Sequence, residues 1–181
     1  MLNHSAIKNI KLIITDVDGV LTNGKIYIDN NNNESKGFNV NDGAAVALAK
    51  CANIPIAFLS GRYSESTSIR ARELKIKYCF QGQLDKINGF KEIIENYNVN
   101  PKEVCYIGDG LIDIPPMEIS GFSIAVSNAH SLVKEKSDHT TSLAGGQGVL
   151  LEIIELILKS QNRLDTIYSK MFKENYDFDK K

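Results

Sequence analysis

Short apolar runs that alternate with amphipathic stretches constrain the fold of this chain more than any other feature. The runs cover residues 10–15, 54–59, 104–107 and 122–126. Short, continuous apolar runs are typical of strands that are buried on both faces of a sheet. The stretches between them have helical periodicity and cover residues 43–51, 64–74, 86–97 and 111–119. Strands that alternate with helices predict an α/β fold, a doubly wound, Rossmann-like parallel sheet with helices on both faces.

Two segments fall outside this alternation. Residues 24–40 contain two strand-like runs around an asparagine run at 30–33. Because Asn tolerates the positive φ of hairpin turns, we expect a β-hairpin flap that projects from the sheet. After an apolar helix at 149–158, residues from about 160 to 181 form a polar, charged tail, whose final residues we expect to be loosely ordered. A length of 181 residues suits one domain, so we expect residues 1–181 to form a single domain.

The chain is nearly neutral, with 21 Lys and Arg against 22 Asp and Glu. This balance argues against a nucleic-acid-binding protein, whose footprint is strongly basic. No apolar run reaches the roughly 18 residues of a membrane span, and residues 1–11 lack the apolar region of a signal peptide. The spacing of cysteine and histidine disfavours a disulfide framework and a zinc site. We therefore expect a cytoplasmic protein that binds neither nucleic acid nor membrane.

Pairs of carboxylates follow two of the predicted strands. Asp16 and Asp18 come directly after the first run, and Asp109 and Asp113 follow the run at 104–107. Ligands bind at the carboxyl ends of parallel strands, so these side chains are expected at one edge of the sheet. Carboxylates that are close together repel and need a cation or a shared proton. Hard oxygen ligands of this kind suit Mg²⁺.

Groups that can hold an anion follow the other predicted elements. Ser60, Gly61 and Arg62 come after the run at 54–59 and offer a hydroxyl, an open backbone N–H and a guanidinium. They open a helix, whose N-terminal N–H groups favour an anion. Lys86 begins the next helix and can act as a point charge on phosphate. The sequence therefore predicts a phosphate site beside the carboxylates.

Each group is common on its own, but here all four occur in order at the ends of successive elements. The set resembles the four motifs of the haloacid-dehalogenase superfamily of aspartyl phosphotransferases, matched by Asp16-x-Asp18, Ser60, Lys86 and Gly108-Asp109-x-x-x-Asp113. Longer strings resemble one branch, the 3-deoxy-D-manno-octulosonate 8-phosphate phosphatases, over roughly residues 8 to 165. Those strings are Asp18-Gly-Val-Leu-Thr-Asn-Gly24, Lys36-Gly-Phe-Asn-Val40, Asp42-Gly43, Phe80-Gln-Gly-Gln83, Tyr106-Ile-Gly-Asp109, Leu111-Ile-Asp113 and Ala144-Gly-Gly146.

The resemblance implies roles for the acidic residues. Asp16 would be the nucleophile that forms an aspartyl-phosphate, which water then hydrolyses. Asp18 would be the general acid for the leaving sugar oxygen and then the base for water. Mg²⁺ would be held by Asp16, the backbone carbonyl of Asp18 and Asp109. Asp113 would orient Lys86 or a metal-bound water.

The resemblance also implies which groups hold the substrate, a small phosphorylated sugar acid. Ser60, the N–H of Gly61 and Lys86 would hold the phosphoryl oxygens. Arg62 and Arg70 match arginines of the family near the substrate, and a guanidinium suits the carboxylate of a keto acid.

Many superfamily members cover the site with a separate cap domain, for which this chain has no room. Only the predicted hairpin and one helix lie between Asp18 and Ser60. The branch that this chain resembles forms homotetramers, in which flaps and C-terminal tails complete neighbouring sites. Tyr27 and Ile28, on the flap, are then expected at an interface between subunits.

The expected substrate is 3-deoxy-D-manno-octulosonate 8-phosphate, an intermediate of lipopolysaccharide core biosynthesis. Phosphatases of nine-carbon, sialic-acid-type sugar acids share several of the strings and remain an alternative, although Arg62 favours the octulosonate. The chain departs from the octulosonate pattern at three positions. Asn41 and Gln147 each replace an Arg, and Gly110 replaces an Asp.

Two other classes remain open. A response-regulator receiver also places carboxylates, a hydroxyl and a lysine around Mg²⁺, but here no Asp follows the run at 54–59. An inactive relative that serves oligomerisation or binding would usually lack the nucleophile, whereas Asp16 is present.

Overall fold

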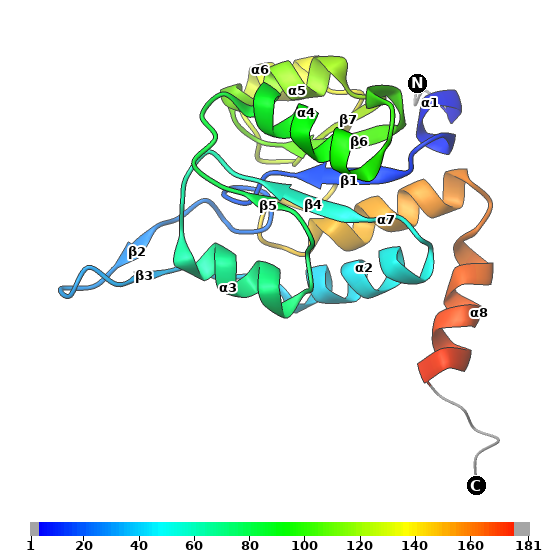
Figure 1. Cartoon of the computed structure of the whole chain (residues 1–181), viewed down its shortest axis with the longest axis horizontal. Coiled ribbons are helices and arrows are strands. Elements are labelled where there is room, and N and C mark those ends of the chain that lie inside the picture. The colour runs from blue at the N-terminus through cyan, green and yellow to red at the C-terminus, as the bar shows by residue number, and fades with distance from the viewer. Residues whose placement is uncertain (1–3, 176–181) are drawn as a thin grey trace, which may run out of the picture.

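The computed structural model describes residues 4–175 and shows a parallel six-stranded sheet between two layers of helices (Figure 1). The strand order is β5-β4-β1-β6-β7-β8. The strands are β1 (Leu12–Thr15), β4 (Ile56–Leu59), β5 (Cys79–Phe80), β6 (Val104–Gly108), β7 (Phe122–Ala125) and β8 (His139–Thr140). The chain enters at the central β1 and winds outward in both directions, which confirms the predicted doubly wound α/β fold.

The four apolar runs form the central strands β4, β1, β6 and β7, as predicted. Every residue of these strands is buried, which explains their continuous apolar sequence. β1 pairs with β4 on one side and with β6 on the other, so Thr15 lies beside both Phe58 and Ile107. Asp16 and Ser60 therefore follow neighbouring strands at the same edge of the sheet.

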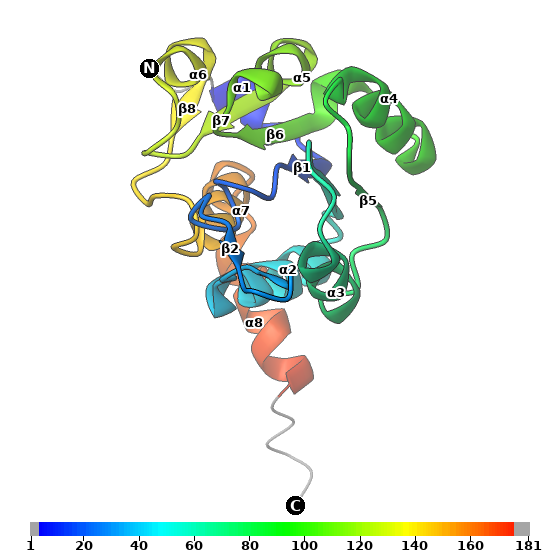
Figure 2. The same cartoon turned by 90° about the vertical axis from the view of Figure 1, so that its left-hand side faces the viewer.

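Helices cover both faces of the sheet (Figure 2). One layer contains α2 (Val40–Cys51), α3 (Glu65–Glu73) and α7 (Val149–Ser160). The other contains α4 (Lys86–Tyr97), α5 (Ile114–Ile119) and α6 (Ser131–Lys136). A short helix, α1 (His4–Lys8), precedes β1, and 3₁₀ turns occupy Pro101–Glu103 and Leu111–Asp113. The predicted helix at 111–119 is thus a 3₁₀ turn followed by α5.

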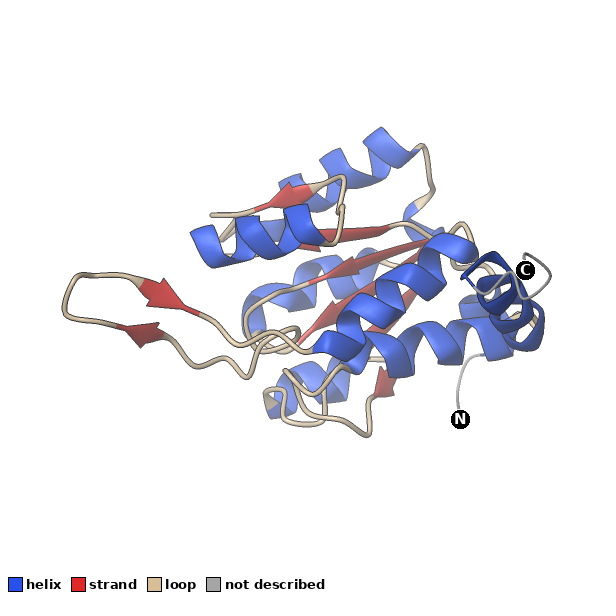
Figure 3. Cartoon of the chain, turned by 90° about the horizontal axis from the view of Figure 1, so that it is seen from below, coloured by secondary structure: helices blue, strands red, loops and turns tan. Residues whose placement is uncertain are grey.

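The flap is a long hairpin that projects from the carboxyl edge of the sheet (Figure 3). Its two short strands, β2 (Tyr27–Ile28) and β3 (Glu34–Ser35), are antiparallel. The tip is ordered by Asp29, whose carboxylate accepts hydrogen bonds from the backbone N–H groups of Asn31 and Asn33. Asn32 adopts a positive φ of 61°, as expected for an asparagine turn.

The polar segment from about residue 160 contains a helix that the sequence did not predict. Leu164–Asn175 forms a helix, α8. Leu164, Ile167, Tyr168 and Met171 recur at helical spacing, and Ile167 is buried against the core. The Tyr168 hydroxyl donates to Glu155 of α7 at 2.6 Å. Charged residues interrupt this apolar face in the sequence, so the helix was not predicted. Residues 176–181 lie outside the described part of the chain.

Within the described residues, no helix is both long and apolar enough to cross a bilayer.

Candidate active site

Asp16 directly follows β1, at the carboxyl edge of the sheet. Its side chain is buried, and the backbone N–H of Val17 donates to Asp16 Oδ1 at 2.6 Å. Burial and, to a smaller extent, the nearby Asp113 raise the pKa of Asp16 to about 8, although Lys86 opposes the shift. Without a further cation, this carboxylate is held in unfavourable surroundings.

Lys86 is the first residue of α4 and is fully buried. Asp85 caps the helix by accepting from the N–H of Ile87, which fixes where α4 begins. The Lys86 ammonium lies 2.8 Å from Asp16 Oδ2 and 2.6 Å from Asp113 Oδ1. Burial alone would lower the pKa of Lys86, but these two carboxylates raise it above its usual value. The lysine is therefore held as a cation beside the predicted nucleophile.

Asp113 organises the opposite wall. Its Oδ1 accepts from the Tyr106 hydroxyl at 2.8 Å, and its Oδ2 accepts from the N–H groups of Asp109 and Gly110, each at 3.0 Å. With Lys86, this makes four donors to one buried carboxylate. Asp113 thus contacts Lys86, one of the two groups that it is expected to orient.

Asp16, Asp109 and Asp113 form a carboxylate cluster. One oxygen from each residue lies within 4.8 Å of the others. Burial raises the pKa of Asp109 to about 6, and Asp113 adds to the shift. Three carboxylates face a single ammonium, that of Lys86, so the cluster carries excess negative charge. A hard divalent cation with oxygen ligands fits this donor set.

Glycines let the backbone approach the cluster. Gly19 has a φ of 90°, and a Cβ there would overlap the carboxylate of Asp109. A Cβ on Gly145 would overlap the carbonyl oxygen of Gly19. The N–H of Gly146 donates to the carbonyl of Val20 at 2.9 Å. The loop at 144–146 is thereby pressed against the loop that follows β1.

Ser60 follows β4, the strand beside β1. Its hydroxyl is buried and has no hydrogen-bond partner within the described part of the chain. An unpaired buried hydroxyl is unfavourable, so an acceptor bound at this position would stabilise it. Gly61 comes next, and a Cβ there would lie only 2.7 Å from Ile112 Cδ1. The residues predicted to bind phosphate therefore lie at the same edge of the sheet as the carboxylates. They are Ser60, Gly61 and Lys86.

Asp18 points toward the flap rather than into the carboxylate cluster. Its two carboxylate oxygens lie 2.7 and 2.8 Å from the ammonium of Lys36, which follows β3. Arg62 also reaches the flap, where it pairs with Glu34 at 2.8 Å. These contacts join the base of the hairpin to the site.

Arg70 also lies away from the carboxylate cluster. Its guanidinium donates to the carbonyl of Asn39 at 2.9 Å and to Glu73 at 3.0 Å. It also lies over the ring of Phe38, 5.9 Å from the centroid. These partners fix the chain between the flap and α2.

Two of the departures from the octulosonate pattern lie in segments that contact each other. A Cβ on Gly148 would lie 2.7 Å from Asn41 Cβ, so the start of α2 contacts the segment that contains Gln147. Gln147 Oε1 accepts from the N–H of Ala144, within the glycine loop. At the third position, Gly110 contributes its backbone N–H to Asp113.

Three residues of the site were not identified from the sequence. Tyr106, Lys36 and Glu34 contact Asp113, Asp18 and Arg62, respectively. Tyr106 looks like an ordinary strand residue, and the flap residues belong to a polar hairpin with no characteristic spacing. Lys36 and Glu34 reach their partners only once the base of the flap is folded against the site.

Comparisons with known proteins agree with this geometry. Residues 59–153 match the family model for haloacid dehalogenase-like hydrolases. The 3-deoxy-D-manno-octulosonate 8-phosphate phosphatase KdsC of Salmonella typhi is 42% identical over 158 residues, which is 87% of this chain and 84% of that protein. The same figures hold for the protein of that name from Escherichia coli strain K12.

Solved structures extend the likeness to the whole fold. The 3-deoxy-D-manno-octulosonate 8-phosphate phosphatase of Yersinia pestis superposes with a TM-score of 0.87 at 39% identity, over 90% of this chain and 88% of that one. The enzyme of that name from Moraxella catarrhalis, solved with a magnesium ion, a phosphate ion and a KDO molecule, gives 0.88 at 35%, over 92% and 96%. With its carboxylates and lysine placed at the edge of a matching sheet, this chain belongs to the haloacid dehalogenase-like hydrolases.

Proposed function

We propose that this protein is a Mg²⁺-dependent phosphatase that hydrolyses 3-deoxy-D-manno-octulosonate 8-phosphate to the free sugar acid and phosphate. The observation that carries the proposal is the Asp16–Lys86–Asp113 ion-pair network at the sheet edge, in a chain 42% identical to phosphatases of that name. We assign the reaction to one domain, residues 1–181.

Asp16 is the proposed nucleophile. One of its oxygens forms a bond to phosphorus while the bond from phosphorus to the sugar oxygen breaks, which gives an aspartyl-phosphate. The N–H of Val17 and the Lys86 ammonium hold the two carboxylate oxygens, so the side chain is already oriented. Water then attacks phosphorus, which releases phosphate and restores the Asp16 carboxylate.

Asp18 is the proposed general acid and base. Its carboxyl group gives a proton to the leaving sugar oxygen, and the resulting carboxylate accepts a proton from the attacking water. It lies two residues beyond Asp16, on the side of the loop that faces the flap.

The proposed metal ligands are Asp16, the backbone carbonyl of Asp18, and Asp109. A bound Mg²⁺ supplies charge neutralisation between the anionic nucleophile and the phosphate dianion. The excess negative charge of the carboxylate cluster supports this assignment. The Moraxella catarrhalis relative was solved with a magnesium ion, which supports the choice of metal.

The proposed phosphate ligands are Ser60, the N–H of Gly61, and Lys86. The Ser60 hydroxyl lacks a partner within the described residues, and Lys86 is held as a cation by Asp16 and Asp113. Groups fixed in this way stabilise the charge of the transferring phosphoryl group. Arg62 is a candidate for the substrate carboxylate, which would compete with Glu34 for the guanidinium. Arg70 would first have to leave Asn39 and Glu73.

We further propose that the active form is a cytoplasmic homotetramer whose flaps complete neighbouring sites. The flap exposes three adjacent apolar side chains, Ile26, Tyr27 and Ile28, at 47, 51 and 64%. A contiguous apolar surface on a projecting hairpin is typical of an interface. The free sugar acid that the reaction releases would then feed the lipopolysaccharide core.

The decisive assay compares phosphate release from 3-deoxy-D-manno-octulosonate 8-phosphate and from N-acetylneuraminate 9-phosphate, with Mg²⁺ present. We expect the octulosonate ester to be preferred, and activity to be lost on chelation and in Asp16→Asn. A preference for the nine-carbon ester would reassign the substrate and keep the chemistry. The assay includes that alternative because Asn41 and Gln147 replace two arginines of the octulosonate pattern.

A further inference from the structure

Lys36 is a buried cation at the base of the flap. It follows β3, and its side chain is 0% exposed. Its ammonium lies 2.7 Å from Asp18 Oδ1 and 2.8 Å from Asp18 Oδ2, so it bridges the whole carboxylate. Burying an ammonium is strongly unfavourable unless it is paired and hydrogen-bonded. The flap therefore brings to Asp18 a charge that is stable there only because of its partners.

The remaining partners of Lys36 fix its position. Thr67 Oγ1, on α3, lies 3.4 Å from the ammonium, and Glu34 Oε1 lies 3.6 Å away. Glu34 in turn pairs with Arg62 through its other oxygen at 2.8 Å. Charges thus alternate in sign along Asp18, Lys36, Glu34 and Arg62. The Ser66 hydroxyl also donates to the Glu34 carbonyl at 3.0 Å, which anchors this strand to α3.

Asp18 depends on this lysine for its orientation. Within the described part of the chain, Lys36 is the hydrogen-bond and ion-pair partner of the Asp18 carboxylate. Asp18 lies in an irregular loop next to Gly19, whose φ is 90°. A carboxylate in such a loop has several rotamers open to it unless a neighbour selects one.

We propose that Lys36 is a positioning residue for phosphoryl transfer, because its ammonium holds Asp18 in the orientation from which it exchanges protons with the sugar oxygen and with water. This rests on the proposed function, in which Asp18 is the acid and base. Lys36 itself transfers no proton. When the carboxyl is protonated, its other oxygen still accepts from the ammonium, so the O–H remains available to the leaving group.

A positioning role and a purely structural role differ in their dependence on the leaving group. A sugar alkoxide is a poor leaving group and needs the proton from Asp18, whereas p-nitrophenolate leaves readily without one. Because kcat/KM reports only the steps up to the first irreversible bond cleavage, it isolates the step in which Asp18 acts as an acid. A variant that merely distorts the flap would lower kcat/KM for both esters alike.

The test compares Lys36→Met, Lys36→Arg and the control Lys25→Met in the full chain, with saturating Mg²⁺. Lys25 is an exposed lysine of the same flap, so it undergoes the same chemical change without a buried partner. For Lys36→Met we expect kcat/KM to fall about 100-fold for 3-deoxy-D-manno-octulosonate 8-phosphate and less than about 5-fold for p-nitrophenyl phosphate. Lys36→Arg keeps the cation and should recover most of the loss, while Lys25→Met should match the unaltered protein.

An equal loss on both esters, or no loss on either, would overturn the inference. Circular dichroism checks that each variant is folded; if Lys36→Met does not fold, Lys36→Gln takes its place with the same expected split, since the amide keeps a donor. Failure of the proposed function gives a different result: the unaltered protein would then hydrolyse neither sugar-acid ester, and the inference would fall with it.

Discussion

Lys86 and Asp113 form an ion pair 2.6 Å long in which both side chains are fully buried. Asp113 also accepts hydrogen bonds from Tyr106 and from two backbone N–H groups. The pair therefore links the start of α4 to the loop after β6, across the edge at which the proposed chemistry occurs. Its integrity should matter for both stability and catalysis.

Replacing Asp113 with Asn should destabilise the protein by about 3 kcal/mol, because it leaves Lys86 incompletely paired and Tyr106 with a poorer acceptor. The free energy of unfolding in urea measures this loss. Asp165→Asn removes an exposed carboxylate from α8 and should change the free energy by less than about 1 kcal/mol. Equal losses in the two variants would show that the buried ion pair contributes no more to the free energy of unfolding than an exposed carboxylate does.

Asp109→Asn should weaken Mg²⁺ binding without unfolding the protein. In the unaltered chain, Mg²⁺ at about 100 times its dissociation constant should raise the free energy of unfolding by about 2.7 kcal/mol, seen as a higher Tm. The variant removes one carboxylate from the cluster with Asp16 and Asp113. Its Tm should respond to Mg²⁺ only at much higher concentration. An unchanged response would exclude Asp109 as a ligand.

Gly19→Ala should abolish activity, because the new Cβ would overlap the Asp109 carboxylate and the φ of 90° is strained for alanine. Gly37→Ala is the matched control, since a Cβ there meets nothing within 4 Å. Phosphate release and Mg²⁺ titration of both variants make the comparison. Retained activity in Gly19→Ala would mean that the Asp109 carboxylate can move away without loss.

Asp42 should make stability depend on pH. It is buried in α2 and accepts from the N–H of Leu150 at the start of α7. Burial raises its pKa from 3.8 to about 6, although Leu150 and Arg70 oppose the shift. The folded state therefore binds more protons than the unfolded state between these values, and the contribution of Asp42 to stability falls as pH rises from about 4 to about 6.

Asp42→Asn keeps an acceptor for Leu150 and removes the titration. The free energy of unfolding of both proteins is measured at pH 4.5 and at pH 7. Relative to the unaltered protein, the variant should become more stable by about 1–3 kcal/mol between pH 4.5 and pH 7. Contributions from Asp16 and Asp109 cancel in this comparison. A difference that does not change with pH would contradict the assigned pKa.

The central sheet could be predicted because its strands are buried on both faces. Such strands form continuous apolar runs in the sequence, which show where they lie, as in Leu12–Thr15 and Phe122–Ala125. The edge strands β5 and β8 have two residues each and leave no comparable signal. α8 was missed because its buried stripe, which includes Ile167, is narrow and interrupted by charged residues.

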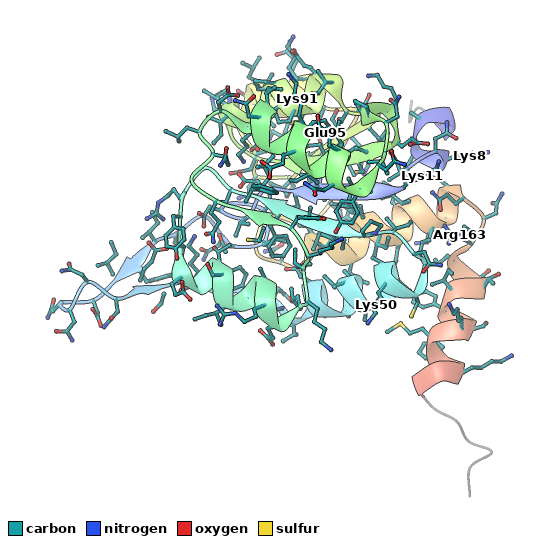
Figure 4. All side chains as sticks on the ribbon, viewed as in Figure 1. Lys8, Lys11, Lys50, Lys91, Glu95 and Arg163 are labelled. Carbon is teal, nitrogen blue, oxygen red and sulfur yellow. The ribbon has the colours of Figure 1, made fainter. Side chains whose placement is uncertain are left out.

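The candidate site could be predicted where strand ends carry charged groups. Asp16, Lys86, Asp109 and Asp113 do meet in the fold. The ion pair of Lys36 with Asp18 could not be foreseen, because it depends on the path of an irregular loop. Conversely, Arg70 donates hydrogen bonds to Glu73 and to the carbonyl of Asn39, and a match to a family motif does not reveal these partners. Lys8, Lys11 and Arg163, which are labelled in Figure 4, lie at the opposite end of the molecule from the flap.

The loop at 144–146 has a consequence for biosynthesis. It packs against the segment after β1, so residues from the beginning and from near the end of the chain meet at Gly19 and Gly145. A nascent chain emerges from the ribosome with Asp16 already synthesised but with nothing to close over it. The enzyme therefore becomes competent only after residues 144–146 have been synthesised, and a fragment that ends before Ala144 would contain every proposed catalytic residue yet lack the loop that packs against Gly19.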